Sequence, residues 1–165
     1  MTPFFKTIGL IAALCLGTPI AAETHAAPKD AIVLTVSGTT SGETAQFDLD
    51  MLMGIDSSII ETTTIWTEGE QQFQGVALNV LMDQLGVTQG TILATAINDY
   101  TVEIPVSDAI EGGPIVAYML NGATMSVRDK GPLWVVYPYD SDANYRSEVI
   151  YSRSIWQLDR IEIVP

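Results

Sequence analysis

The apolar residues of this chain occur in short runs that end at glycine, proline or asparagine, and this spacing limits what it can fold into. Segments rich in Val, Ile and Thr, such as 32–36, 91–96 and 115–120, are typical of short strands. Strands and helices do not alternate regularly along the chain. The pattern therefore predicts an α+β domain with a few short helices and one mixed, mainly antiparallel and partly barrel-like sheet.

Capping and turn residues indicate where the individual helices and strands begin and end. Asp48 before an apolar turn that stops at Gly54 predicts a short capped helix, and Gly86 ends a second helix over 80–85. Asn121-Gly122 is a tight-turn dipeptide, and residues 139–147 form a polar loop. Strands are expected at residues 32–36, 45–48, 58–66, 91–96, 100–106, 115–120 and 133–137, with one or two more within 149–164.

The first residues are typical of an export signal. Lys6 precedes an apolar run over 8–16 that is too short to span a bilayer, and small residues follow it. We expect a signal peptide over residues 1–22, a flexible leader over 23–30 and one domain over 31–165, located in the periplasm and not inserted in the membrane. Cleavage after Ala26 or Ala27 and an uncleaved anchor are the alternatives.

The domain lacks the side chains of several common active sites. Cys15 and His25 are the only cysteine and histidine, and both precede residue 31. Catalytic triads with histidine, zinc sites with His or Cys ligands, haem held by these residues and iron–sulfur clusters are thereby excluded from the domain. A pair of carboxylates of the glycosidase type remains open.

Charge argues against two classes of partner. After residue 22 the chain carries six Lys and Arg against twenty Asp and Glu, a net charge of −14. Nucleic acid and anionic membrane surfaces both require a positive footprint, so neither is expected as a partner.

Several segments follow one another in a recognisable order over residues 32–164. The clearest are Phe47-Asp48-Leu49-Asp50-Met51-Leu52, Phe73-Gln74-Gly75-Val76-Ala77-Leu78, residues 96–106, Lys130-Gly131-Pro132-Leu133-Trp134 and residues 154–163. In this order they resemble the sulfite oxidase-like, oxidoreductase molybdopterin-binding domains. The resemblance implies the sulfite oxidase-like molybdopterin-binding fold and a pocket shaped for a pterin.

The chain lacks the residue that holds the metal in that family. Where the family has its molybdenum-ligating cysteine, this chain has Ile65-Trp66-Thr67, and Ile155 replaces a closing lysine. Tryptophan offers no ligand to molybdenum. The sequence is most similar to exported, cysteine-lacking members regarded as pterin-binding proteins. That resemblance implies a protein that needs no cofactor, binds a reduced pterin, and signals to the ectodomain of a membrane-bound regulator of cyclic di-GMP.

Two other functions remain alternatives. The first is a molybdopterin-dependent oxidoreductase of the sulfite oxidase-like family, which the missing thiol and imidazole argue against, as they argue against an enzyme in general. The second is an interaction domain that binds no small molecule.

A pterin requires an aromatic face, an acceptor for its amino edge and a donor for its carbonyl. We expect Trp66 to stack on the ring, Asp140 to accept from the amino edge and Arg153 to donate to the carbonyl. The bland alternatives are core packing for Trp66, a turn aspartate for Asp140 and a surface ion pair for Arg153. Arg128 is the candidate for a phosphate, beside Lys130. The remaining expectations are Tyr137, Tyr139 and Tyr145 as lids, no metal ligand, and Trp134 and Trp156 as mainly core residues.

Overall fold

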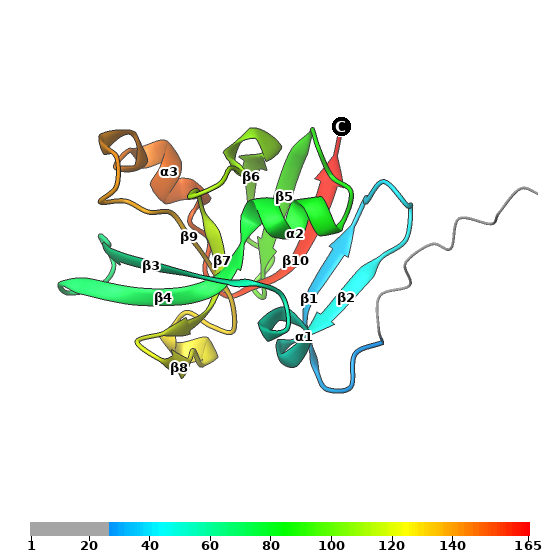
Figure 1. Cartoon of the computed structure of the whole chain (residues 1–165), viewed down its shortest axis with the longest axis horizontal. Coiled ribbons are helices and arrows are strands. Elements are labelled where there is room, and N and C mark those ends of the chain that lie inside the picture. The colour runs from blue at the N-terminus through cyan, green and yellow to red at the C-terminus, as the bar shows by residue number, and fades with distance from the viewer. Residues whose placement is uncertain (1–26) are drawn as a thin grey trace, which may run out of the picture.

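Two five-stranded sheets carry the fold, as a computed structural model of residues 27–165 shows (Figure 1). The strands divide into two open sheets, and neither of these closes into a barrel. The first has the spatial order β2 (Ala45–Asp48), β1 (Ile32–Ser37), β10 (Leu158–Val164), β5 (Thr91–Ala96) and β6 (Thr101–Pro105). The second consists of β3 (Ser57–Thr63), β4 (Glu70–Ala77), β7 (Ile115–Leu120) and β8 (Ala123–Thr124), with β9 (Trp134–Val136) also paired to β7.

The α+β class and the mixed, mainly antiparallel pairing are confirmed. Only β1 and β10 run parallel, in a register that pairs Val36 with Ile161, and every other strand pair is antiparallel. The last strand therefore lies in the middle of the first sheet, between β1 and β5.

Local sequence signals explain two of the three helices. Asp48 begins α1 (Leu49–Met53), and its Oδ1 accepts the Met51 N–H at 2.8 Å. Because the carboxylate accepts this backbone bond, and also the N–H groups of Lys29 and Asp30, the pKa of Asp48 is lowered. The second helix, α2 (Leu78–Gln84), ends just before Gly86, which has φ +68°.

A third helix corrects the expectation of extended chain after residue 148. Residues Glu148–Arg153 form α3, with Ser147 as its N-cap and Glu148 in its first turn. Val149, Ile150 and Tyr151 form a short apolar run that is also compatible with a strand, but the Ser147 hydroxyl accepts from the Ile150 N–H and starts a helix instead. Single turns of 3-10 helix occur at η1 (Val106–Asp108), η2 (Val127–Asp129) and η3 (Ala143–Tyr145).

One hydrophobic core receives side chains from both sheets. Leu34 and Ile92 of the first sheet and Phe73 and Val116 of the second are fully buried. Trp134 lies among them, with its ring edge to face against Phe73 at 5.2 Å, which confirms its expected place in the core.

Close packing of β4 on β7 depends on a glycine. A Cβ atom built on Gly75 would lie 2.1 Å from the carbonyl oxygen of Val116 and 2.5 Å from the Cα of Ala117. The register shifts at this point, between Gln74 and Gly75. No other residue fits there without displacing the backbone of β7.

The expected signal peptide (1–22) and the first part of the expected leader (23–26) lie outside the described residues. The end of the leader is held to the domain, through the Lys29 and Asp30 bonds to Asp48. Within residues 27–165, no helix has the length and apolar character needed to cross a bilayer.

Candidate functional site

A pocket of about 410 Å³ lies beside Trp66, and we call it the Trp66 pocket. Three segments form it: the turn between β3 and β4, the turn between β5 and β6, and the stretch from α3 to the start of β10. Its aromatic walls are Trp66, Tyr100, Tyr151 and Trp156, and the rest of its lining is Ala96, Asn98, Ser152, Ser154, Ile155 and Gln157. No charged side chain belongs to this lining.

Trp66 is the centre of an aromatic cluster. Its ring meets Trp156 at 5.5 Å, Tyr151 at 5.8 Å and Trp134 at 5.8 Å between centroids, each edge to face. Trp66 is half-buried, so part of its ring remains available to the pocket. Such edge-to-face contacts hold the ring in one orientation.

Short polar contacts fix the backbone that carries Trp66. The Thr64 hydroxyl accepts the Trp66 N–H at 3.0 Å and lies 2.7 Å from the Thr67 hydroxyl. The two threonines therefore close a tight turn around the tryptophan.

Two carboxamides give the pocket one acceptor and one donor. Gln157 Nε2 donates to the Val127 carbonyl at 2.7 Å, which leaves Oε1 to accept from a ligand. Asn98 Oδ1 accepts the Tyr100 N–H at 3.2 Å, which leaves the amide nitrogen to donate. The Trp66 pocket can therefore form hydrogen bonds with a flat, neutral ring that carries both a donor and an acceptor at its edge.

The nearest cation lies behind one wall of the pocket. Lys130 Nζ is 5.6 Å from the ring centroid of Trp134 and 6.0 Å from that of Trp156. Its charge is directed at the two indole rings, where it contributes a cation–π contact.

Asp140 is engaged with the protein rather than with the pocket. Its carboxylate accepts the N–H and hydroxyl of Thr63 and the hydroxyl of Thr62, at the end of β3. Because the Thr63 backbone and hydroxyl bonds stabilise the ionised form, the pKa of Asp140 lies below its ordinary value. Arg146 Nη1 also lies 3.9 Å from Asp140 Oδ1. These contacts occupy most of the acceptor capacity of the carboxylate.

Arg153 also has a partner inside the protein. Its Nη1 donates to Asp108 Oδ2 at 2.9 Å, and the same oxygen accepts the Tyr137 hydroxyl at 2.8 Å. Burial, followed by the neighbouring Asp108, raises the pKa of Tyr137, so its hydroxyl stays protonated and donating. This arrangement ties α3 to η1. The ion pair that was the alternative role for Arg153 therefore forms, and its partner is Asp108.

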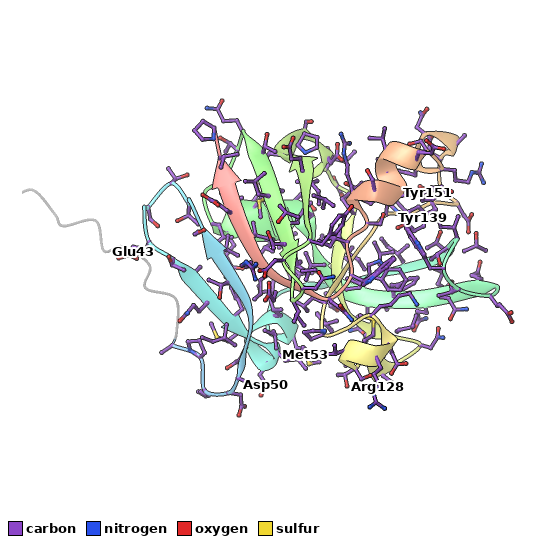
Figure 2. All side chains as sticks on the ribbon, turned by 180° about the vertical axis from the view of Figure 1, so that it is seen from behind. Glu43, Asp50, Met53, Arg128, Tyr139 and Tyr151 are labelled. Carbon is purple, nitrogen blue, oxygen red and sulfur yellow. The ribbon has the colours of Figure 1, made fainter. Side chains whose placement is uncertain are left out.

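The other expected ligand residues are dispersed. Tyr139 is buried, donates to Ser154 Oγ at 2.6 Å, and packs behind Trp66 and Tyr151, so it is not a lid. Its burial raises its pKa to about 12. Tyr137 is likewise buried rather than a lid, and Tyr145 packs on it at 5.9 Å. Figure 2 shows Arg128 at the lower edge of the domain, away from Tyr139 and Tyr151, and it is exposed on η2.

Of the expected ligand residues, the structure places only Trp66 in the lining of the pocket. Sequence reasoning missed Tyr100, Tyr151 and Gln157, and assigned Trp156 mainly to the core although 36% of it is exposed. Asn98 was interpreted only as a turn residue. Its position in a hairpin turn, facing the segment after α3, could be found only from the pairing of β5 with β10.

The residues of this site do not fit a molybdenum centre. Residues 27–165 contain no cysteine or histidine, and within them no three acidic side chains gather where they could hold a metal. The half-buried ring of Trp66, in contact with four neighbouring aromatic rings, supplies no ligand atom. No step of a reaction through molybdenum can be derived from this chain.

Comparison with protein families gives a match to this chain. A family model described as the oxidoreductase molybdopterin binding domain matches residues 25–143, from the leader into η3. No curated protein matches the chain significantly.

Proposed function

This chain belongs to the oxidoreductase molybdopterin-binding domain family, and from that premise we propose that it is an exported protein that binds a reduced pterin without molybdenum. We further propose that it reports the bound pterin to a membrane-bound regulator of cyclic di-GMP. The export, the pterin and the signalling role go beyond family membership and are parts of the proposal.

The observation that carries the proposal is the neutral, aromatic character of the Trp66 pocket. A volume of about 410 Å³ is in the range of about 300–1,000 Å³ that small-molecule sites occupy. Four aromatic side chains and no charged ones line it. A free pterin is flat and carries no phosphate, so it matches this lining better than the phosphorylated molybdopterin.

The polar groups suit the heterocycle. A pterin has an amide-like edge with an N–H donor next to a carbonyl acceptor. Gln157 Oε1 can accept from such an edge, and the Asn98 amide nitrogen can donate to it. The faces of Trp66 and Trp156 supply stacking surface.

Calorimetric titration of the purified protein with a tetrahydropterin under anaerobic conditions tests this function. We expect binding at one site with a Kd of about 1 μM or lower, equivalent to about −8 kcal/mol. Tryptophan fluorescence should change in parallel, because two of the three tryptophans line the pocket. No heat and no fluorescence change with reduced or oxidised pterins would end the proposal.

Metal analysis tests the alternative of a molybdopterin-dependent oxidoreductase. Protein produced in a host that makes the cofactor should contain no stoichiometric molybdenum. Bound molybdenum would favour the enzyme, although the lining of the pocket offers no ligand for it.

The signalling role requires a partner whose binding depends on pterin. The ectodomain of a membrane-bound cyclic di-GMP enzyme from the same organism should bind the pterin-loaded protein at least tenfold more tightly than the empty protein. Equal binding in both states would favour the interaction domain that needs no ligand.

A further inference from the structure

The outer edge of β3 is the longest unpaired strand edge among the described residues. β3 pairs only with β4, and it is seven residues long. The other outer strands are shorter: β2 has four residues, β6 has five and ends at Pro105, and β8 has two. Figure 1 shows β3 at the rim of the long β3–β4 hairpin.

Two hydrogen bonds fix which backbone groups of β3 face outward. The Thr63 N–H donates to Asp140 and so points away from β4. The Gln72 N–H donates to Asn121 Oδ1, away from β3, and Gln72 is the register partner of Glu61. Because these directions alternate along an antiparallel strand, the N–H and C=O groups of Ile59 and Glu61 also face outward.

β3 has few of the devices that normally protect such an edge. Its sequence, Ser-Ser-Ile-Ile-Glu-Thr-Thr, contains no lysine, proline or glycine, and Glu61 is its one charged residue. Ile59 is 58% exposed on the outer face. The Asp140 carboxylate closes the edge only at its Thr63 end.

A groove runs beside the same stretch of strand. It has a volume of about 410 Å³ and is lined by Ser58 to Glu61 on one side and by Gly112, Gly113, Ile115 and Pro138 on the other. A Cβ on Gly112 would meet nothing within 4 Å, so this glycine leaves open space beside the strand. An added strand could therefore place an apolar side chain here while its backbone pairs with β3.

The charge around this edge decides between partners. Asp56, Glu61, Glu68 and Glu70 lie on or next to the β3–β4 hairpin, and neither strand contains a basic residue. A second copy of this chain would bring the same acidic side chains to the interface. A basic segment would instead place opposite charges in cross-strand contact.

We propose that β3 is a docking edge for an extended, basic segment of another protein, which adds to the second sheet as an antiparallel strand. Ile59 and Glu61 exchange backbone hydrogen bonds with the partner. A basic side chain lies opposite Glu61, an apolar one enters the groove at Ile60, and a second apolar one covers Ile59. The proposal does not depend on what the Trp66 pocket binds.

Amide exchange followed by NMR tests the proposal with a defined probe. The probe is a synthetic peptide with a central Lys-Leu-Val sequence between flanking threonines and lysines. In the free protein the amides of Ile59 and Glu61 should exchange at least tenfold faster than those of Ser58 and Ile60, which face β4. Saturation with the probe should slow Ile59 and Glu61 at least tenfold and leave Ser58 and Ile60 unchanged.

Two matched pairs of variants complete the test. Ile59→Pro removes one outward N–H and no bond to β4, so it should weaken the probe at least tenfold, whereas Ile59→Thr should stay within threefold. Glu61→Lys should weaken the lysine probe and strengthen a probe in which glutamate replaces lysine. The charge exchange remains informative if the proline variant unfolds.

Four results would overturn the proposal. One is a probe affinity that Ile59→Pro and Glu61→Lys both leave unchanged. Another is protection of amides only outside β3. A third is a dimer of the protein alone that Ile59→Pro dissociates, since the occupant would then be a second copy. The fourth is the absence of any probe binding at millimolar concentration.

Discussion

Trp66 and Trp156 meet edge to face with ring centroids 5.5 Å apart and an interplanar angle of 78°. The first lies in the turn between β3 and β4 and the second just before β10, so the contact joins the two sheets at the pocket. Both rings also line the pocket, so the pocket depends on the tertiary fold and not on one loop alone.

Replacing Trp66 should weaken pterin binding more than it weakens the fold. Trp66→Ala removes one aromatic wall, and we expect tetrahydropterin affinity to fall at least tenfold, equivalent to about 1.4 kcal/mol. Trp66→Phe keeps a ring and should stay within about threefold. Calorimetry on both variants measures the difference, and equal affinity for wild type and Trp66→Ala would remove Trp66 from the site.

At Asn98, the amide nitrogen that would donate to the ligand can be tested separately from the oxygen that holds the Tyr100 N–H. Asn98→Asp retains the oxygen that accepts the Tyr100 N–H and replaces only the amide nitrogen. We expect about tenfold weaker pterin binding, the effect of losing one good hydrogen bond, with Tm nearly unchanged. Asn98→Ala removes both groups and should lower affinity and Tm together. Unchanged affinity in Asn98→Asp would place the donor elsewhere.

The Asp140 carboxylate should stabilise the fold, and this stabilisation should depend on pH. Because Thr63 and Thr62 stabilise the ionised carboxylate, its folded pKa lies below the ordinary value of 3.8. Its stabilising contribution is therefore complete above that ordinary value and is lost as the pH falls through the lower, folded pKa. Thermal unfolding between pH 6 and pH 2 should show a Tm decrease that is smaller in Asp140→Asn.

The same variant separates the two roles considered for Asp140. Because the carboxylate contacts β3 and not the Trp66 pocket, Asp140→Asn should leave tetrahydropterin affinity within about threefold at pH 7. A tenfold loss of affinity without a loss of stability would restore Asp140 as the acceptor for the amino edge.

Gly75 should not tolerate any side chain. The Cβ of Gly75→Ala would lie 2.1 Å from a backbone oxygen of β7, so the strands must separate. We expect a loss of about 2 kcal/mol or more in the free energy of unfolding, measured with urea. Gly54→Ala is the control, because its Cβ would meet nothing closer than 3.4 Å and should change stability by less than about 0.5 kcal/mol. Equal effects would show that the β4–β7 contact is adaptable.

Local signals made much of the fold predictable. The Asp48 cap, the helix before Gly86, and strands such as 91–96 and 115–120 depend on neighbours within a few residues, and all are confirmed. The helix α3 was missed because the short apolar run Val149-Ile150-Tyr151 is equally compatible with a strand. The division into two sheets depends on long-range pairing, which apolar runs do not encode.

The candidate site was less predictable for the same reason. Trp66 could be located because the family resemblance marks its position. Asp140 and Arg153 have the right chemistry for a ligand, but Thr63 and Asp108 bind them first. Whether a polar side chain is free for a ligand is decided by distant neighbours, and the sequence does not show them.

The central position of β10 in the first sheet has a consequence for biosynthesis. β1, the first strand, has its parallel neighbour only when β10 is present, and β5 loses one of its two neighbours without it. The chain therefore cannot complete this sheet until its final seven-residue strand has left the ribosome. A chain without β10 would expose two interior strand edges, one on β1 and one on β5.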